Sequence, residues 1–552
     1  MNPTPDNRNI AAQLPRVALE HPNDAAVIVQ GKRGANGRHA YSQWTLAELN
    51  AESDRMAHGL TRAGITRGMR TVLMVKPSLE FFALTFALFK TGAIPVMVDP
   101  GMGIKNLKTC LDEAAPEAFV GIPKAHVARV LFGWAKRHLK IRITVGGPKL
   151  WGGHTLSALM TREATPYPMA PMHDDDLAAI LFTSGSTGIP KGAVYTHGIF
   201  NAQVEILRKD YGIRPGEKDL ATFPLFALFG PALGMAAIVP DMDASKPATA
   251  NPANIVAAVQ DHEATNLFAS PALIEIVGRH GEAQGVKLPT LRRVISAGAP
   301  ADLPSLRRFS TLLNPGVQIY PSYGATESLP VSFIGHDEQI NDTAAATDNG
   351  AGVCVGRPVE DVSVAIVRIT DSPIPAWSED LLLPQGTIGE ICVKGPMVTR
   401  EYFNQPGATA LAKIYGEDGA VYHRMGDVGY IDAQGRLWMC GRKSHRVVTA
   451  TGTLFTIPCE RIFNTHPAVR RTALVGIVKN AKVLPVLCVE CVKGNTTPQS
   501  EIEAELRALA AQHAITSSID TFLFHPSFPV DVRHNAKIFR EKLTVWAQEK
   551  LP

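Results

Sequence analysis

The sequence is poor in cysteine, and the few cysteines that it has are scattered. Its 552 residues include seven, which is not the dense, paired pattern of a disulfide-stabilised secreted domain. Cys488 and Cys491 form a C-x-x-C pair inside a segment rich in valine and leucine, which predicts a strand. Residues three apart on a strand point to opposite faces, so we expect no shared metal or redox site there.

An excess of charge of either sign is also lacking. The chain has 55 basic and 51 acidic residues, and no stretch concentrates basic residues strongly enough to predict a nucleic-acid partner. A hydrophobic content of 45% is typical of a globular protein, and the length predicts two or more domains. Because the N-terminus has no basic start followed by an apolar run, we predict no signal peptide and expect a cytoplasmic location.

One long uncharged run could be a membrane-spanning segment. Residues 220–240, "LATFPLFALFGPALGMAAIVP", carry no charge over a length that could cross a bilayer. Two prolines and two glycines interrupt the run, and no asymmetry of lysine and arginine would orient a span. We therefore expect no transmembrane segment but a buried strand, loop and helix that line an apolar cavity. A membrane-embedded protein is the alternative.

Strand-like runs alternate with helical patterns in the first 350 residues, as in "RTVLMVK", "SLEFFALTFALFKTG" and "AIPVMVD". This alternation predicts parallel sheets built from β–α–β units. Short strand patterns separated by turn residues follow and predict a β-rich part. A polar, basic break predicts a hinge at 442–446, between an N-terminal domain (1–441) and a small C-terminal domain (447–552).

The stretch "TSGSTGIPKG", residues 183–192, contains three glycines, four hydroxyl groups and one lysine. Glycine allows a close approach of the backbone, and hydroxyl, N–H and ammonium donors suit phosphate oxygens. Lys191 lies between Pro190 and Gly192, which does not match the G-x-x-x-x-G-K-[ST] pattern of the P-loop NTPases. The segment "GMG" at 101–103 lacks the third glycine of a dinucleotide fingerprint. A phosphate ligand of another class is therefore expected.

The longer form of this loop, "FTSGSTGIPKG", resembles the phosphate loop of the adenylate-forming superfamily of acyl-CoA synthetases, luciferases and peptide-synthetase adenylation domains. Other superfamily motifs follow in order: "SAGAP" (296–300), "YPSYGATE" (320–327), "GEICVKGP" (389–396), "HRMGDVGYID" (423–432), "GRK" (441–443) and "FPVDVRHNAKIFREKL" (528–543). The resemblance implies an α/β fold with two sheet-based lobes and a β-rich part in a large N-terminal domain. A small, mobile α+β lid would follow.

The resemblance also implies an ATP site assembled from several motifs. Tyr323 would stack on the adenine, Asp427 would accept the two ribose hydroxyls, and Arg442 would face the ribose. The phosphate loop would hold the β- and γ-phosphates. The residues implied to bind ATP are Thr183, Ser184, Gly185, Ser186, Thr187, Gly188, Lys191, Gly298, Ala299, Tyr323, Gly324, Thr326, Asp427, Arg442 and Lys537.

The implied catalytic residues serve the attack of a carboxylate on the α-phosphate of ATP. Both reactants are anions, so positive charge and oriented donors must offset their repulsion. Thr326 would bond the α-phosphate, and Glu327 would bind Mg²⁺. Lys191 belongs to the phosphate loop, and Lys537 on the lid would contact the carboxylate and the α-phosphate together.

Several positions depart from the superfamily pattern. Ala227 stands where many members have histidine, which removes bulk near the expected carboxylate and would suit an acid branched beside its carboxyl group. The lysine motif has Asn535 and Ala536 where Ser and Gly are usual, and Ser444 stands where many members have Asp or Lys. The residues implied to line the acyl pocket are Phe226, Ala227, Gly230 and Gly234.

Within the superfamily the whole chain most resembles the β-lactone synthetases of bacterial olefin biosynthesis, including "FPLFALFGPALG" and "RHNAKIFREKL". This resemblance implies ATP-dependent closure of a long-chain 2-alkyl-3-hydroxyalkanoic acid to a β-lactone, with release of AMP and pyrophosphate. It also implies association with other enzymes of the olefin pathway. His197, His423 and His534 lie near motifs, and nothing marks one of them as the base for the hydroxyl proton.

Two other functions remain open at this point. The first is a long-chain fatty acyl-CoA or acyl-AMP ligase, because the motifs of the first half-reaction are shared. The second is a nucleotide sensor without catalysis, which the retention of Lys191, Glu327, Asp427, Arg442 and Lys537 disfavours. The chain lengths and stereochemistry of the acid are not encoded in any recognisable motif.

Overall fold

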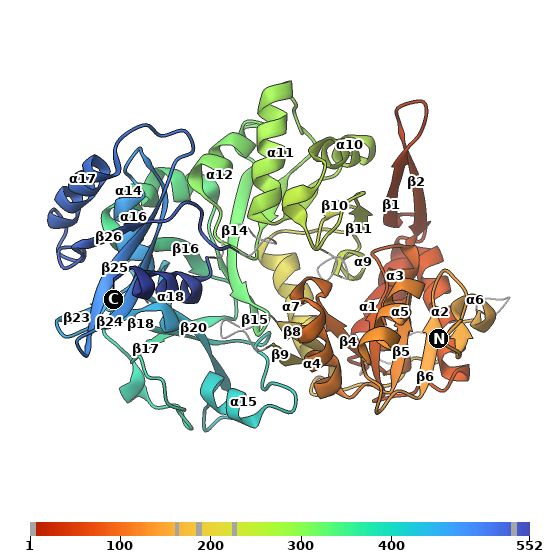
Figure 1. Ribbon diagram of the computed structural model, residues 1–552. Coiled ribbons are helices and arrows are strands. Elements are labelled where there is room, and N and C mark those ends of the chain that lie inside the picture. Colours follow the sequence, from red (N-terminus) through yellow and green to blue (C-terminus); the bar gives the residue numbers. More distant parts are fainter. Residues whose placement is uncertain (1–6, 161–164, 184–189, 224–228, 531–537, 552) are drawn as a thin grey trace.

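The computed structural model describes residues 7–160, 165–183, 190–223, 229–530 and 538–551, and Figure 1 shows their arrangement. Most described strands belong to two large sheets. The seven-stranded sheet lies on the right of Figure 1, among the orange helices. The fourteen-stranded sheet crosses the rest of the molecule, and the C-terminal strands, in blue, form a separate three-stranded sheet.

The seven-stranded sheet is parallel except for its last strand, which pairs antiparallel with its neighbour. In spatial order its strands are β7 (His154–Thr155), β6 (Ile141–Thr144), β5 (Ala118–Gly121), β3 (Arg70–Met74), β4 (Ile94–Val98), β8 (Leu177–Thr183) and β9 (Lys191–Thr196). The helices of this lobe are α2 (Leu46–Arg62), α3 (Leu79–Thr91), η2 (Pro100–Met102), α4 (Ile104–Ala114), α5 (Pro123–Phe132) and α6 (Leu156–Leu159).

Helix α3 shows how the sequence determines this lobe. Ser78 caps its first turn by accepting a hydrogen bond from Phe81 N, and Gly92 ends it at a φ of +72°. Every residue from Phe81 to Thr91 is buried, as expected for a helix that is apolar on all sides. Lys90 Nζ contacts Asp54 Oδ1 at 2.6 Å and so joins α3 to α2. The predicted β3–α3–β4 unit is confirmed.

The fourteen-stranded sheet changes from parallel to antiparallel pairing at β14, so the antiparallel part begins before residue 350, after which the sequence predicted a β-rich part. In spatial order it contains β17 (Ser363–Val367), β18 (Gly389–Lys394), β20 (Val421–Ile431), β21 (Leu437–Arg442), β16 (Val353–Pro358), β15 (Ser328–Phe333), β14 (Gln318–Ala325), β13 (Arg293–Ser296), β12 (Asn266–Ala269), β10 (Lys218–Ala221), β11 (Ala236–Val239), β1 (Ala25–Arg33) and β2 (His39–Thr45), with β19 (Lys413–Tyr415) paired to β20.

Helices lie between the strands in sequence in both the parallel and the antiparallel part of this sheet. The longer ones are α1 (Gln13–Glu20), α7 (His197–Asp210), α10 (Pro252–His262), α11 (Pro271–Gln284), α12 (Leu303–Ser310) and α15 (Pro406–Ala412). The short ones are η1 (Ile10–Ala12), α9 (Phe229–Leu233), η3 (Pro247–Thr249), α13 (His336–Glu338), η4 (Gln339–Thr343), α14 (Ala344–Ala346), η5 (Thr347–Ala351), η6 (Glu379–Leu381) and η7 (Lys443–His445). The segments "EATNLFAS", "PALIEIVGRHGEAQG" and "RRVISAG" form a further strand–helix–strand unit, β12, α11 and β13, in line with the predicted alternation.

The C-terminal part has its own sheet and packs against the β-rich part through α16. Its elements are β22 (Val447–Thr449), β23 (Gly452–Leu454), α16 (Thr456–Phe463), β24 (Val469–Lys479), β25 (Lys482–Cys491), α17 (Gln499–Ala511), β26 (Thr521–Phe524) and α18 (Arg540–Lys550). Helix α16 contacts β21 and η5, and Arg461 on it pairs with Asp348 of η5 at 2.5 Å. The division into domains at 441 and 447 stays a prediction.

The uncharged segment 220–240 folds as expected where it is described. It contains the end of β10, then α9 and β11, and the described residues of α9 and β11 are buried. None of the described helices is both long and apolar enough to cross a bilayer. Cys488 and Cys491 lie on β25 and belong to different apolar clusters on its two faces, which confirms that they share no site.

Candidate active site

The phosphate loop joins two paired strands. Thr183 ends β8, Lys191 begins β9, and these two residues face each other across the antiparallel pair. On its other side β8 pairs in parallel with β4. Five predicted ATP-binding residues of this loop lie outside the described residues: Ser184, Gly185, Ser186, Thr187 and Gly188.

A second hairpin presents Thr326 and Glu327. Ala325 on β14 pairs with Ser328 on β15, so Thr326 and Glu327 form the two-residue turn between these strands. A Cβ atom at Gly324 would come within 2.9 Å of the carbonyl oxygen of Ser328, so this position of the hairpin needs glycine. The Tyr195 hydroxyl on β9 donates a 2.5 Å hydrogen bond to the carbonyl of Thr326. The two hairpins are therefore joined at the predicted site.

Hydrogen bonds hold Glu327 at both its main chain and its side chain. The amide N–H of Thr399 and the Thr399 hydroxyl donate to its carbonyl oxygen at 2.9 and 3.2 Å. The Tyr402 hydroxyl donates to Glu327 Oε1 at 2.7 Å, and Glu327 is only 8% exposed. Burial and the neighbouring carboxylate raise the pKa of Tyr402, so this hydroxyl stays protonated and serves as a donor.

Two lysines lie near the ring of Tyr402. The Nζ atoms of Lys191 and Lys413 are 5.1 and 5.9 Å from its centroid, within the range of a cation–π contact. Lys413 also donates a 3.0 Å hydrogen bond to the Thr399 hydroxyl. Burial lowers the pKa of Lys413 to about 7, although the negative charge of Glu327 acts in the opposite direction.

Tyr323, Asp427 and Arg442 form a second linked group. Asp427 on β20 faces Arg442 on β21 in the strand register, and Asp427 Oδ1 pairs with Arg442 Nη1 at 2.9 Å. The Tyr323 hydroxyl donates to Asp427 Oδ2 at 2.7 Å. Burial raises the pKa of Asp427, and the Arg442 guanidinium opposes that shift. The structure thus brings together three residues predicted for the nucleoside end of ATP.

The predicted residues Gly298 and Ala299 leave the sheet beside this group. They follow β13, and Ser296 on β13 pairs with Pro321 on β14, two residues before Tyr323. Gly298 has a φ of +94°, a backbone conformation that favours glycine. In parallel sheets ligands bind outside the carboxyl ends of the strands, and β12 and β13 both end here, whereas β14 continues to Ala325.

A buried carboxylate supports the strand of Asp427 and the expected hinge. Glu390 on β18 is fully buried and pairs with Arg424 at 2.7 Å and with Lys443 at 3.0 Å. Arg446 pairs with Asp371 at 2.6 Å. The segment at 442–446 is therefore tied to the β-rich part by three ion pairs, counting the one between Arg442 and Asp427.

The two described glycines of the predicted acyl pocket have packing roles. A Cβ atom at Gly230 would touch Ala237 on β11 at 3.4 Å. One at Gly234 would meet Pro215 at 3.0 Å and Val17 at 3.1 Å, and Gly234 has a φ of +78°. Neither glycine lines the nearby cavity, and Phe226 and Ala227 lie outside the described residues. An acyl-binding role for these four positions stays a prediction.

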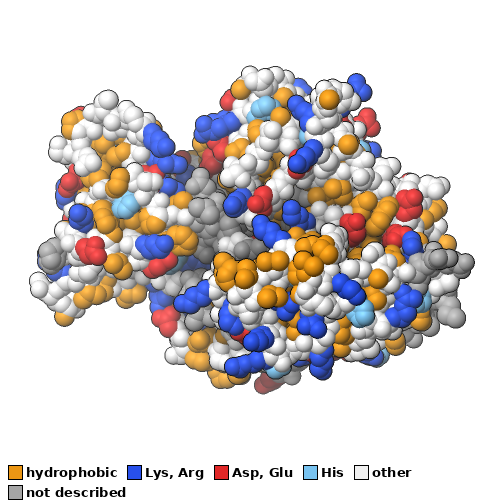
Figure 2. All heavy atoms as spheres, turned by 45° about the vertical axis from the view of Figure 1, so that its right-hand side comes forward, with side chains coloured by type: hydrophobic (Ala, Val, Ile, Leu, Met, Phe, Trp, Pro, Cys, Tyr) orange, Lys and Arg blue, Asp and Glu red, His pale blue; other side chains and the backbone are white. Residues whose placement is uncertain are grey.

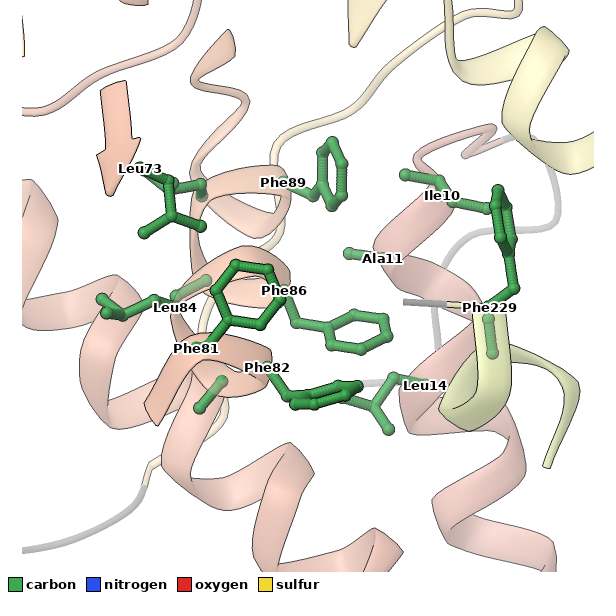
Figure 3. Close-up of a cluster of buried hydrophobic side chains, with 14 of the residues drawn as sticks. Ile10, Ala11, Leu14, Leu73, Phe81, Phe82, Leu84, Phe86, Phe89 and Phe229 are labelled. Atoms are coloured by element: carbon green, nitrogen blue, oxygen red, sulfur yellow. The ribbon is translucent and has the colours of Figure 1, made fainter. Parts of the chain in front are cut away.

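An apolar cavity of about 20 Å³ lies between α3, α7, α9 and η1, which is room for roughly one water molecule. Figure 3 shows Phe86 and Phe89 of α3 reaching toward Ile10. An alkyl chain could enter this cavity only if the side chains of Phe86 and Phe89 moved. The lining residues are Ile10, Thr85, Phe86, Phe89, Phe200, Phe229 and Ala232. Two of them belong to the 220–240 segment, as expected of a segment that lines an apolar cavity.

Two histidines near the motifs are buried and neutral. His197 Nδ1 accepts a 3.1 Å hydrogen bond from Ile10 N, and burial lowers the pKa of this histidine to about 4. His423 Nδ1 donates to the carbonyl of Ala412 at 3.2 Å, and burial holds its pKa well below the usual range. His534 lies outside the described residues, as does the predicted catalytic residue Lys537.

The residues present fit Mg²⁺ and ATP. Mg²⁺ usually takes one or two protein carboxylates and completes its shell with water and phosphate oxygens, so the single carboxylate of Glu327 suits it. Among the described residues no cluster of three His, Cys, Asp or Glu side chains could hold a metal ion by itself. Asp427 retains acceptor capacity for ribose hydroxyls, because a carboxylate offers about four lone-pair sites.

Several residues of this site were not predicted from the sequence. Tyr402 and Thr399 donate hydrogen bonds to Glu327, and Lys413 donates one to Thr399. Glu390 pairs with Arg424, which lies on the same strand as Asp427. One weak signal was present, because Lys413 is a lone lysine in the apolar stretch "ALAKIY". The other residues follow no recognisable pattern in the sequence. Only the three-dimensional structure shows that they contact the site.

Comparison with known proteins identifies relatives over the whole chain. A family model described as AMP-binding enzyme matches residues 14–403. Two proteins named olefin beta-lactone synthetase, from Stenotrophomonas maltophilia (strain K279a) and Xanthomonas campestris pv. campestris, are each 50% identical over 98% of this chain and 98% of their own length. The structure of the amide bond synthetase McbA from Marinactinospora thermotolerans superposes with a TM-score of 0.79 at 23% identity, covering 98% of this chain and 99% of McbA. That likeness shows the fold.

Asp427→Asn should raise the KM for ATP about 10- to 100-fold, the range expected from loss of hydrogen bonds to a charged group. The value of kcat at saturating ATP should change little, because ribose contacts are made in the ground and transition states alike. Initial rates at varied ATP would measure this, with the exposed Asp418→Asn as control. An unchanged KM for ATP with an altered KM for the acid would contradict the nucleotide-site assignment.

Lys413→Met should stabilise the fold most at low pH. The folded-state pKa of Lys413 is about 7 and its unfolded value 10.5, so burial of the ammonium is most unfavourable below pH 7. Between pH 7 and 10.5 the unfolded chain binds the extra proton, and the wild type gains stability with rising pH by up to about 5 kcal/mol. Urea unfolding at several pH values would measure the gap between variant and wild type. A difference in the free energy of unfolding that does not change with pH, as expected for the exposed Lys482→Met, would contradict the lowered pKa of Lys413.

Proposed function

The chain belongs to the AMP-binding enzyme family, and on this premise we propose that it closes 2-alkyl-3-hydroxyalkanoic acids to β-lactones. It is an adenylate-forming ligase, and it uses ATP to activate an acyl group. The observation that carries the proposal is the 50% identity, over 98% of the chain, with two olefin beta-lactone synthetases. The proposed substrate is a long-chain, lipid-type acid.

In the first half-reaction a substrate carboxylate oxygen attacks the α-phosphorus, and pyrophosphate leaves. Lys191 and the loop donors would hold the β- and γ-phosphates, while Tyr323, Asp427 and Arg442 would hold the nucleoside. Thr326 lies at the hairpin turn, where its side chain would bond the α-phosphate. Bound at Glu327, Mg²⁺ would supply positive charge beside the phosphate oxygens. The Tyr402 hydroxyl keeps the Glu327 carboxylate oriented for that role.

In the second half-reaction the 3-hydroxyl oxygen of the same molecule attacks the activated carbonyl carbon, and AMP leaves with its electron pair. The hydroxyl proton passes to a base. This step forms a strained four-membered ring, and the good leaving group together with the fixed proximity of the hydroxyl helps to offset the strain. CoA is not needed as an acceptor.

We propose that residues 447–552 act as a lid that carries Lys537 to the carboxylate and the α-phosphate. Closure would assemble the positive charge only when substrates are bound and would exclude water. The ion pairs of Arg442, Lys443 and Arg446 hold the predicted hinge on the β-rich part. A pivot beyond Arg446 would leave all three ion pairs in place. Association with other olefin-pathway enzymes and a cytoplasmic location stay predictions.

Lys537→Ala should fold normally and slow adenylate formation by about 10²- to 10³-fold, the scale of one transition-state donor. ATP–pyrophosphate exchange would measure this half-reaction directly. Lys542→Ala is the matched control, because Lys542 is exposed on α18 only five residues away and should be replaceable. Near-normal exchange by Lys537→Ala would show that the catalytic lysine is misplaced.

The acceptor distinguishes this function from that of an acyl-CoA ligase. With a 2-alkyl-3-hydroxy acid, ATP should yield AMP over many turnovers without any thiol, and a strained lactone carbonyl should appear in the infrared spectrum. The matched acid without the 3-hydroxyl should bind but be adenylated at most once per site or hydrolysed slowly. Rapid turnover of the deoxy acid with CoA, together with a thioester from the hydroxy acid, would establish the ligase instead.

A further inference from the structure

Helix α5 is apolar on two sides, and only one of them faces the protein. Ala125 and His126 are buried, and the His126 ring stacks on Trp151 with centroids 4.8 Å apart. The other side exposes large apolar side chains at the helical spacing i, i+3, i+4: Val127 at 47%, Val130 at 57% and Leu131 at 72%. A helix side of this kind needs a partner that tolerates apolar side chains.

One more exposed apolar residue lies next to this side of the helix. Leu150 is 84% exposed and precedes Trp151, whose stacking on His126 places this loop alongside α5. We call the surface formed by Val127, Val130, Leu131 and Leu150 the α5 surface.

The segment that contains the α5 surface is basic, and of its basic side chains Lys140 pairs with Glu117 at 2.9 Å. Residues 121–153 contain seven lysines and arginines and no aspartate or glutamate, in a chain whose net charge is only +4. Among the residues that the structure describes, no carboxylate pairs with the side chains of Lys124, Lys136, Arg137 or Lys149, and all four are exposed. Figure 2 turns the right-hand side of Figure 1 forward and shows basic, acidic and apolar side chains intermingled on that face.

We propose that the α5 surface docks the protein on an anionic lipid bilayer. Apolar side chains on one side of a helix, flanked by lysine and arginine, are the features of helices that lie in the interface of a membrane. Each Lys or Arg near such a surface contributes a favourable interaction with anionic headgroups. The helix is anchored on the other side by its packed core residues, so docking leaves the fold intact.

The same observations disfavour other occupants. A nucleic acid would satisfy the basic residues but would leave four apolar side chains against phosphates. A second copy of the chain would place one basic surface against another, and the resulting repulsion opposes that contact. A stable protein interface also needs roughly 20–30 residues on each side, far more than this surface offers. The proposal does not depend on which acid the enzyme activates.

The test is sedimentation of the full chain with lipid vesicles, made either of phosphatidylglycerol and phosphatidylcholine in equal parts or of phosphatidylcholine alone. The chain should bind the anionic vesicles, release at high salt, and bind the neutral vesicles far less. Lys136→Gln with Arg137→Gln should weaken the partition coefficient about 30-fold, from about 1 kcal/mol for each charge.

Val130→Glu should abolish vesicle binding, whereas Val545→Glu on α18, where Val545 is 60% exposed, should leave it unchanged. Thermal unfolding of both variants should match that of the wild type, because both side chains are exposed. Equal binding to neutral and anionic vesicles, or normal binding by Val130→Glu, would overturn the proposal. A lipid-independent dimer that Val130→Glu dissociates would overturn it too, in favour of an interface between copies of the chain.

Discussion

The contact between the two hairpins is the feature on which the site depends. Tyr195 on β9 belongs to the seven-stranded sheet, and Thr326 lies in the turn that ends β14 of the fourteen-stranded sheet. Their hydrogen bond joins the two sheets beside Glu327 and the strands that flank the predicted phosphate loop. Thr399 and Tyr402 then fix Glu327 from the opposite side. A two-residue turn held this way has little freedom to move, which is what orienting a metal ligand requires.

Much of the fold and part of the site could be predicted from the sequence, for a physical reason. The β3–α3–β4 unit and the uncharged segment 220–240 are patterns of neighbouring residues, and local periodicity determines them. The motifs that contain Tyr323, Glu327 and Asp427 are short and ordered, so the family could be inferred without a structure. The comparisons confirm the adenylate-forming family and the α/β fold.

The supporting contacts could not be predicted, because they join distant positions. Glu327 meets Tyr402 across 75 residues, and Tyr323 meets Asp427 across 104. The packing roles of Gly230 and Gly234 depend on Ala237, Pro215 and Val17, and no local pattern reveals such close approaches. The basic segment 121–153 is a different case, because it is contiguous in the sequence and the balanced charge of the whole chain conceals it.

The central claim is that the carboxylate is activated and that the hydroxyl of the same molecule closes the ring. A hydroxy acid labelled with ¹⁸O at both carboxylate oxygens tests it directly, by mass spectrometry of the products. The account predicts AMP with one ¹⁸O and a lactone with one ¹⁸O at its carbonyl, because one labelled oxygen leaves on phosphorus. Unlabelled AMP with a lactone that retains both labels would mean that the hydroxyl is activated instead, and would contradict the account.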